Sequence, residues 1–294
     1  MGEKRSRWTL ASLQRHCSWL EPLTRAAICR LLHRLHISCK LAREYIHSPD
    51  LDYEQKLAAV RAILQISLDP RSQCVVLFID QMGYYRQPRV GTAWEEQGHR
   101  QALARRSYRS DCGYRVVGAL HPFSGQVLYR QASHIRIPTL VDFYQTIVAT
   151  YATAQTIYLV MDNWPIHFHP DVLAALQPQQ FAWPMHRPRN WPTEPSKKAR
   201  RLNLPIQMVP LPTYAPWTNP IEKLWRKLKQ EVLCLHHRAD RWEDLRTQVA
   251  EFLDAFHEGS PQLLRYVGLT ERSRLYGDIV KQASRSPKIT EVNC

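Results

Sequence analysis

The chain has 294 residues, of which 40 are Lys or Arg and 26 are Asp or Glu, so its formal net charge is +14. This length can form one large domain, or one domain with a small appendage, around a sizeable core. The charge favours a polyanionic partner, and no apolar run is long enough to span a bilayer. Because the opening sequence MGEKRSRWTL also lacks a secretory apolar stretch, we expect a cytoplasmic protein that binds nucleic acid.

The seven cysteines are scattered along the chain and form no CxxC pair, which suits a reducing compartment. One group, Cys29, His33, His36 and Cys39, has the residue types of a zinc site. Structural zinc sites more commonly show tighter paired spacings. We therefore favour ordinary cysteines and histidines on a helix over a metal site.

Residues 1–70 are predicted to be helical. Thr24 is a suitable N-cap for a helix with an i, i+3, i+4, i+7 apolar stripe, and Asp52 with Gln55 resembles a capping box. Nine Lys or Arg residues fall within positions 1–47, against three Glu. Short basic helices favour a helix-turn-helix module that binds DNA. The alternative is a small helical bundle that packs on the next domain and has a solvated basic surface.

The pattern changes at residue 73, after which strand and helix patterns alternate. Continuous apolar runs at 74–80 and 156–162 predict strands buried on both faces, and 114–133 predicts a hairpin. A short edge strand bounded by prolines is expected at 205–212. Helices are expected at 138–152, 170–177, 219–235 and 240–257. This order predicts an α/β domain over residues 73–258, a mixed sheet flanked by helices. Residues 259–294 are expected to form a C-terminal tail.

Residues 183–205 interrupt this alternation, because their prolines disfavour regular structure. The segment WPMHRPRNWPTEPSKKARRLNLP carries six Lys or Arg residues and one Glu. With Trp183 and Trp191 interleaved among the cations, it could lie along a nucleic-acid backbone. An equally supported alternative is a tether whose charges are only solvated.

Two of the buried strands end in an aspartate, Asp80 and Asp162, and Glu222 opens a later helix. A carboxylate at the end of a hydrophobic strand is costly to bury unless it is paired or binds a cation. Ligands collect at strand ends in open α/β sheets, so the three carboxylates could converge on divalent cations, which prefer oxygen ligands. Two such ions can activate an attacking oxygen and stabilise the leaving oxygen in phosphoryl transfer.

Each carboxylate also has a structural alternative. Asp80 and Asp162 could cap the turns that follow their strands. Glu222 is the third residue after Asn219, a suitable N-cap, so it could complete a capping box. Capping and metal binding are compatible, because the first turn of a helix can project toward a sheet edge. Arg226 follows Glu222 by one turn, where its charge could neutralise a phosphate.

Three sequence blocks carry a resemblance to a known family, and they read VVLFIDQMGYYRQPRVGTAWEEQG, IYLVMDNWPIHFHP and LPTYAPWTNPIEKLWRKLKQEV. In this order, over residues 74–235, the chain resembles the bacterial insertion-sequence branch of the mariner-like DDE transposases. The resemblance implies an RNase H-like fold and a catalytic, metal-binding triad at Asp80, Asp162 and Glu222. It also implies two Mg²⁺ ions, with Mn²⁺ as a substitute, and cut-and-paste transposition through DNA cleavage and strand transfer.

Other residues fall on positions of the same motifs. Asn163, His167, Asn219 and Arg226 match accompanying positions, and Trp94 matches an aromatic residue that either packs or stacks on a base. The resemblance implies double-stranded DNA as a partner and a homodimer on paired DNA ends. Phosphate contacts are expected from three basic clusters, namely Arg100, Arg105, Arg106 and Arg109; Lys197, Lys198, Arg200 and Arg201; and Arg226, Lys227 and Lys229.

The sequence departs from the family in two respects. The 59 residues 163–221 separate the second acid from the third, more than in mariner-like relatives, and the basic segment 183–205 accounts for the excess as an insertion. Relatives usually carry two helix-turn-helix units before the catalytic domain, whereas residues 1–70 have room for one. Three alternatives account for this: a partial product, one frame of a split gene, and a natural shortened form. The alternatives to a transposase are a DNA-binding remnant or repressor without activity, and a general RNase H-like nuclease.

Overall fold

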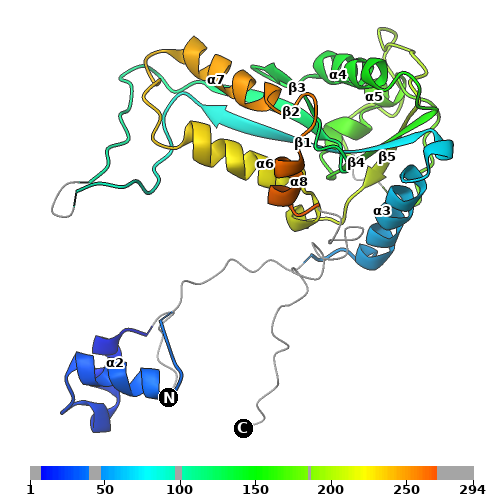
Figure 1. Cartoon of the computed structure of the whole chain (residues 1–294). Helices are drawn as coiled ribbons and strands as arrows, with labels where there is room; N and C mark the ends of the chain where they lie inside the picture. Colours follow the sequence, from blue (N-terminus) through cyan, green and yellow to red (C-terminus); the bar gives the residue numbers. More distant parts are fainter. Residues whose placement is uncertain (1–7, 40–47, 97–100, 185–186, 270–294) are drawn as a thin grey trace. The chain divides into compact units, whose positions relative to one another are not determined.

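The computed structural model describes residues 8–39, 48–96, 101–184 and 187–269 of the chain. The chain divides into two compact units, Met1–Ile46 and His47–Cys294 (Figure 1). Across the described residues, no helix has both the length and the apolar character needed to cross a membrane.

The described part of the first unit is helical. Helices α1 and α2 comprise Leu10–His16 and Arg25–Arg34, and a 3-10 turn lies between them at Ser18–Leu20. The Thr24 hydroxyl accepts a hydrogen bond from the backbone N of Ala27 at 3.2 Å, so the predicted N-cap of α2 is confirmed. Ile28 on the apolar stripe of α2 is fully buried. The identity of this unit as a helix-turn-helix module stays a prediction.

The candidate zinc ligands of the first unit are not gathered into a metal site. Cys29 Sγ lies 3.9 Å from His33 Nε2 within α2, and Cys39 is exposed beyond the end of the helix. Among the residues that the structure describes, no group of three or more His, Cys, Asp or Glu side chains is arranged to hold a metal ion.

Helix α3 (Tyr53–Ser67) belongs to the second unit, although the helical region was expected to extend to residue 70. Its buried residues Leu57, Val60 and Leu64 pack in one hydrophobic cluster with Val76 and other strand residues. A helix that buries its apolar stripe on the sheet is part of the same core, so the division between the units falls at residue 46.

The predicted capping box at the start of α3 is wrong. Asp52 is the N-cap of this helix, but its side chain accepts no capping hydrogen bond. Instead, the backbone N of Asp52 donates to Asp50 Oδ1 at 3.0 Å. The local sequence pattern was suitable, but tertiary contacts of Asp50 set the geometry at this helix end.

Five strands of the second unit form one mixed sheet in the order β3-β2-β1-β4-β5. They comprise β1 (Cys74–Tyr85), β2 (Gly113–Leu120), β3 (Val127–Ala132), β4 (Thr156–Met161) and β5 (Ile206–Pro210). Strand β1 pairs antiparallel with β2 and parallel with β4, and β4 pairs parallel with β5. The predicted hairpin and the predicted edge strand are confirmed, because β2 pairs antiparallel with β3 and β5 ends the sheet.

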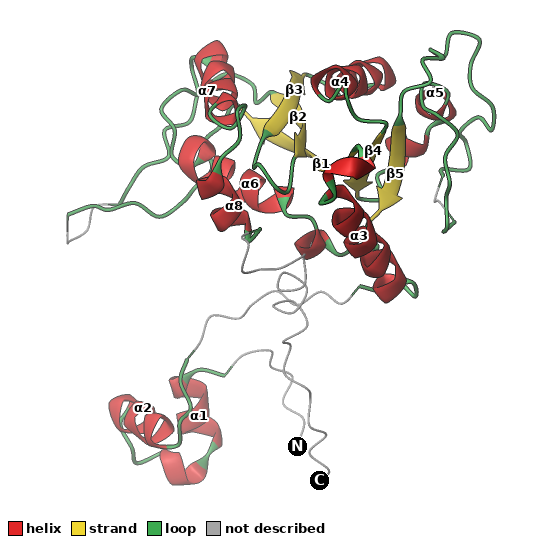
Figure 2. Ribbon diagram, turned by 45° about the vertical axis from the view of Figure 1, so that its right-hand side comes forward, coloured by secondary structure: helices red, strands yellow, loops and turns green. Residues whose placement is uncertain are grey.

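Helices cover both faces of the sheet (Figure 2). Because side chains alternate along a strand, Leu77 and Ile79 of β1 pack on the face that α4 (Ile137–Thr150) and α5 (Pro170–Leu173) cover. On the other face, α3 covers Val76 and Phe78, and the helices that follow β5 cover the half formed by β1, β2 and β3. The predicted α/β fold class is confirmed.

Three α-helices follow β5 within the described residues, and a π turn (Lys229–Leu233) extends the first of them. They are α6 (Ile221–Leu228), α7 (Trp242–Asp254) and α8 (Pro261–Val267). The Ser260 hydroxyl caps α8 by accepting a hydrogen bond from the backbone N of Leu263 at 3.1 Å, and Leu263 and Val267 are buried. Residues 261–267 therefore pack in the domain, although a tail was expected from residue 259, and residues 270–294 lie outside the described residues.

Gly118 of β2 allows α6 to approach the sheet closely. A Cβ atom at this position would lie 2.6 Å from Cη2 of Trp225, which is buried on α6. We expect Gly118→Ala to lower the free energy of unfolding by about 1–3 kcal/mol, because the indole or the whole helix would have to move. Urea denaturation of the two proteins measures this difference.

Gly83→Ala on the neighbouring strand β1 is the matched control. Its Cβ atom would meet only the Arg115 side chain, at 3.4 Å, and that exposed side chain can shift. An equal loss of stability in the two variants would show that close packing of α6 on the sheet is not what requires Gly118.

Candidate active site

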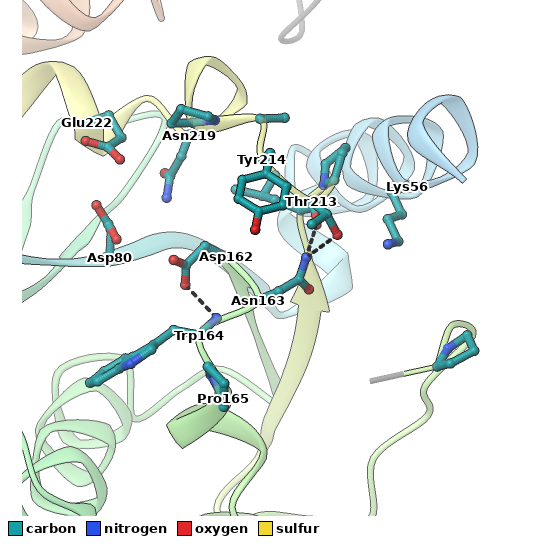
Figure 3. A pocket seen from close by; sticks show the side chains of 15 residues that line it. Lys56, Asp80, Asp162, Asn163, Trp164, Pro165, Thr213, Tyr214, Asn219 and Glu222 are labelled. Carbon is teal, nitrogen blue, oxygen red and sulfur yellow. Dashed lines mark hydrogen bonds between the residues drawn. The ribbon is translucent and has the colours of Figure 1, made fainter. Parts of the chain in front are cut away.

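The three predicted acids come from separate elements and line one cavity of about 630 Å³. Asp80 lies within β1, Asp162 directly follows β4, and Glu222 is in the first turn of α6. Figure 3 shows Asp80 and Glu222 with their carboxylates facing the same space and Asp162 beside them. The structure therefore places at one site three carboxylates that are remote along the sequence.

Asp80 is held in the core of the sheet by α6. Its side chain is buried, and its Oδ2 accepts a hydrogen bond from Nε1 of Trp225 at 2.9 Å. Asp80 is paired in register with Gly118, the residue whose missing side chain makes room for the Trp225 ring. Because β1 continues to Tyr85, Asp80 does not end its strand, and its alternative role as the cap of a turn is wrong.

The electrostatics of the cavity keep Asp80 protonated near neutral pH. Burial, together with the negative charges of Glu222 and Asp162, raises the pKa of Asp80 to about 8. Burial also raises the pKa of Asp162 and of Glu222, although the positive charge of Lys229 opposes the shift of Glu222. The three carboxylates are therefore not fully neutralised by positive side chains of the cavity.

Asp162 combines the two roles that the sequence left open. Its Oδ1 accepts a hydrogen bond from the backbone N of Trp164 at 3.2 Å, so it does cap the turn after β4. Its side chain nevertheless remains exposed to the cavity. The neighbouring Asn163 donates from Nδ2 to the Leu211 carbonyl at 3.2 Å and to Thr213 Oγ1 at 3.0 Å, which joins this turn to the loop after β5.

The predicted capping box at Glu222 is wrong. The N-cap of α6 is Pro220, and no side chain makes a capping hydrogen bond at this helix end. Asn219, the expected cap, instead donates from Nδ2 to the carbonyl of Ile79 on β1 at 3.2 Å. This contact ties the start of α6 to the strand that carries Asp80, and the Glu222 carboxylate is turned to the cavity instead of to its own helix (Figure 3).

His167 and Arg226 do not line the cavity. His167 is buried, its Nδ1 lies 2.8 Å from the Tyr144 hydroxyl, and burial lowers its pKa to about 3, so the ring is neutral. Its ring meets that of Trp164 edge to face, with centroids 5.3 Å apart. His167 therefore supports a residue of the cavity wall, whereas Arg226 is exposed and acts on Glu222 through its charge.

The donor atoms of the cavity suit a hard divalent cation. Besides three carboxylates, Asn219 presents a buried Oδ1 atom that has no hydrogen-bond partner. Carboxylate and amide oxygens are the ligands that Mg²⁺ prefers, and a cation would neutralise the acids that now repel one another. Among the described residues, no three acidic side chains are close enough together to form a metal site on their own.

Several predicted phosphate contacts are occupied within the chain. Arg200 donates to Asp142 Oδ1 at 2.5 Å, and Lys227 pairs with Glu231. Arg100 lies outside the described residues. Within the described part of the chain, the predicted contacts that remain exposed without such a pair are Arg105, Arg106 and Arg109 between β1 and β2, Lys197, Lys198 and Arg201 in the insertion, and Arg226 on α6, whereas Lys229 is half-buried.

Sequence reasoning missed part of the cavity wall, notably Lys56, Thr213 and Tyr214. Lys56 lies one turn before Val60 on the buried stripe of α3, and its side chain is 8% exposed. A lysine on the apolar stripe of an amphipathic helix is the signal that could have found it. Tyr214 lies within the third motif block, but nothing in its sequence context indicates that its ring is exposed.

A mixed sheet with acids on two neighbouring parallel strands, and a third acid on a helix packed against it, defines an RNase H-like site of the DDE type. The family described as "DDE superfamily endonuclease" matches residues 75–246, more than half of the chain. The chain therefore belongs to this family of endonucleases. The predicted resemblance to mariner-like transposases is confirmed at the family level.

A Shigella sonnei protein described as "Insertion element IS630 uncharacterized 39 kDa protein" is 22% identical over 255 residues. The match covers 86% of this chain but 66% of that protein, so the chain spans about two thirds of the length of this relative.

Solved structures of Mos1 share the fold. The Mos1 mariner paired-end complex with Mn has a TM-score of 0.59 at 15% identity, covering 97% of this chain and 82% of that chain. The pre-cleavage Mos1 transpososome has a TM-score of 0.57 at 14% identity, covering 98% and 82%. At these identities the likeness shows the fold alone.

The raised pKa of Asp80 predicts how stability depends on pH without metal. Below the usual aspartate pKa, Asp80 is protonated in both the folded and the unfolded chain. As the pH rises toward 8, the unfolded chain loses this proton and the folded chain keeps it, so the free energy of unfolding falls. We expect the Tm in EDTA to fall more between pH 5 and pH 8 for the wild type than for Asp80→Asn.

Differential scanning calorimetry at each pH measures the Tm. Mg²⁺ added at pH 8 should restore the Tm of the wild type more than that of Asp80→Asn. Parallel pH profiles for the two proteins would show that Asp80 does not titrate in this range.

Proposed function

We propose that the protein is a DNA transposase that cleaves DNA strands at the ends of an element and joins them to target DNA. The observation that carries this proposal is the cavity that brings Asp80, Asp162 and Glu222 together on the fold of a DDE superfamily endonuclease. The Mos1 relatives include a paired-end complex and a strand transfer complex, which supports the same substrate for this chain. A DNA-binding remnant is less well supported, because mere binding gives no reason for three acids around one cavity.

Two Mg²⁺ ions, or Mn²⁺ in their place, would be held by the three carboxylates, with the unpartnered Asn219 Oδ1 as a further oxygen donor. Mos1 structures are described with Mn and with Mg, which supports this choice. Bound divalent ions supply activation of the attacking oxygen and stabilisation of the leaving oxygen.

The residues of this chain prepare the site in three ways. Trp225 orients the Asp80 carboxylate through its indole N–H, and Asp80 would lose its proton to solvent on binding a divalent cation. Asn163 fixes the turn that carries Asp162 to the loop after β5. The buried, neutral His167 supports Trp164 at the cavity wall and carries no positive charge that would compete with a divalent cation for the acids.

The insertion 183–205 would present a basic surface to the DNA backbone. Ser196 donates from its backbone N and its hydroxyl to Asp171 at 2.6 and 2.9 Å, and Arg200 binds Asp142 on α4. These contacts anchor the segment to the domain, which favours a fixed binding surface over a free tether. Arg200 serves as an anchor, so the phosphate contacts fall to the neighbouring exposed cations.

A second copy of the chain is the proposed protein partner. The segment between β1 and β2 projects away from the sheet in Figures 1 and 2, and its base is fixed by the hydrogen bond from Arg86 N to the Cys112 carbonyl at 2.9 Å. The Trp94 side chain on this segment is fully exposed, and the side chains of Leu103 and Tyr108 are largely exposed. Apolar side chains displayed in this way favour a protein or DNA surface as their cover.

We expect Asp162→Asn to abolish Mg²⁺-dependent DNA strand cleavage while DNA binding survives, because the amide keeps the hydrogen bond to Trp164 and loses the charge that a cation needs. Incubation with labelled terminal-repeat DNA, followed by denaturing electrophoresis and a bandshift assay, separates the two activities. Cleavage by the variant at the wild-type rate would remove the site assignment, and a wild type that binds DNA without cleaving it would favour the repressor. Cleavage that yields no strand-transfer product would favour the general nuclease.

We expect the double variant Lys197→Ala, Lys198→Ala to weaken DNA binding equally for all sequences. If both lysines contact phosphates, the slope of log Kd against log salt concentration falls by about 2. The matched control is Arg71→Ala, an exposed cation in the 3-10 turn before β1, which should leave this slope unchanged. A salt dependence equal to that of the wild type in the double variant would return the insertion to the role of a solvated tether.

A further inference from the structure

We propose that Tyr214 is a stacking platform for an unpaired nucleobase next to the scissile phosphate. This inference rests on the proposed function and deepens it, because it names a part of the DNA that the cavity recognises besides the backbone. It is carried by the position of the ring, by the strained backbone of this residue and by the network that holds its neighbours in place.

The Tyr214 ring stands in the wall of the acid-lined cavity while remaining 72% exposed. Figure 3 shows its hydroxyl end directed into the space near Asp162, with Trp164 and Pro165 on the other side of that space. All four residues line the same cavity. One part of the cavity is thus lined by carboxylates, and an adjoining part has flat apolar surfaces.

The backbone of Tyr214 adopts a left-handed conformation, with φ of 53°. This region is costly for a bulky residue, on the order of 1–3 kcal/mol, and such strain persists only where the surroundings enforce it. A relaxed backbone would redirect the ring. The strain is therefore the cost of presenting this aromatic side chain to the cavity instead of packing it in the core.

Hydrogen bonds on both sides of Tyr214 enforce this conformation. The backbone N of Thr213 donates to Asp50 Oδ2 at 2.7 Å, its carbonyl accepts from the Ser48 hydroxyl at 2.6 Å, and its Oγ1 accepts from Asn163. On the other side, the carbonyl of Ala215 accepts from the backbone N and the hydroxyl of a buried threonine in the following turn. Both neighbours of Tyr214 are fixed, and only the ring faces open space.

A buried ion pair anchors this network. Lys56 Nζ lies 2.7 Å from Asp50 Oδ2, and the two side chains are 8% and 5% exposed. Burial alone would raise the pKa of Asp50, but hydrogen bonds from Lys56, Thr213 and Asp52 lower it overall, so the carboxylate stays ionised as an acceptor. Thr213 is therefore held by a charged acceptor, and through it the position of Tyr214 is set.

A nucleotide has the two chemistries that this cavity separates. Its phosphate belongs at the carboxylates, where bound cations would neutralise it, and its flat base fits an exposed aromatic ring. Stacking of one base on an aromatic side chain contributes about 1–3 kcal/mol, or about 5- to 150-fold in affinity. The base must be unpaired, because a base inside a duplex has no free face to offer.

The test measures binding without cleavage. The probe is a 20-base-pair hairpin duplex with a 3′ extension of two nucleotides, either thymidines or abasic sites, in Ca²⁺ without Mg²⁺. We expect the wild type to bind the thymidine form about 5- to 150-fold more tightly than the abasic form. Tyr214→Ala should lose this preference, and Tyr214→Phe should keep it, because the phenyl ring stacks without the hydroxyl.

Tyr214→Asn provides a second variant in case alanine disturbs the loop, since Asn tolerates the left-handed conformation and offers no ring. The inference is overturned if the wild type shows no preference for the thymidine form, or if both ring-free variants retain it. A Phe variant that behaves like the Ala variant would also overturn it, because the hydroxyl and not the ring would then make the contact.

Failure of the proposed function gives a different result. If the wild type never cleaves DNA in Mg²⁺ but shows a preference that depends on the Tyr214 ring, the transposase activity is wrong and the base-binding site remains. If cleavage depends on Asp162 but the preference is absent, the active site remains and the stacking role of Tyr214 is wrong.

Discussion

A carboxylate buried in the middle of a central strand is the constraint on which the rest of the structure depends. Asp80 can occupy this position because α6 brings the Trp225 indole N–H to it, and the indole fits because the paired residue is Gly118. The same close approach of α6 places Glu222 at the cavity. The packing of Trp225 against Gly118, which has no side chain, therefore determines where Glu222 lies.

Charge is distributed to serve this constraint. The acids are concentrated in a cavity where burial and mutual repulsion make negative charge unfavourable. The cations of this strongly basic chain lie around them or anchor loops. Arg200 and Lys56 illustrate the second use, since each fixes a loop through an ion pair, Arg200 at the surface and Lys56 in a buried position. A buried pair such as Lys56–Asp50 contributes little net stability, but removing one partner is costly, so the pair specifies geometry.

Local sequence patterns predicted the elements of this fold, because apolar periodicity and caps such as Thr24 depend on near neighbours. The three acids were also found in advance, through their strands and through motif resemblance. The role of Asn219 was missed, because its amide binds the Ile79 carbonyl, 140 residues away, in preference to its own helix. The Asp50–Lys56 pair was missed for the same reason. Its role is to hold the backbone N of Thr213, and no local sequence pattern connects Thr213 to Asp50.

The hydrogen bonds of Ser48 and Asp50 to Thr213 have a consequence for how the catalytic domain can be isolated. These residues directly follow the first compact unit, yet they hold Thr213, which lines the cavity. A fragment that starts at the first strand would contain every acid and still leave the Thr213 loop without its charged support. The smallest self-sufficient piece of the domain therefore begins upstream of Ser48, about 25 residues before the sheet does.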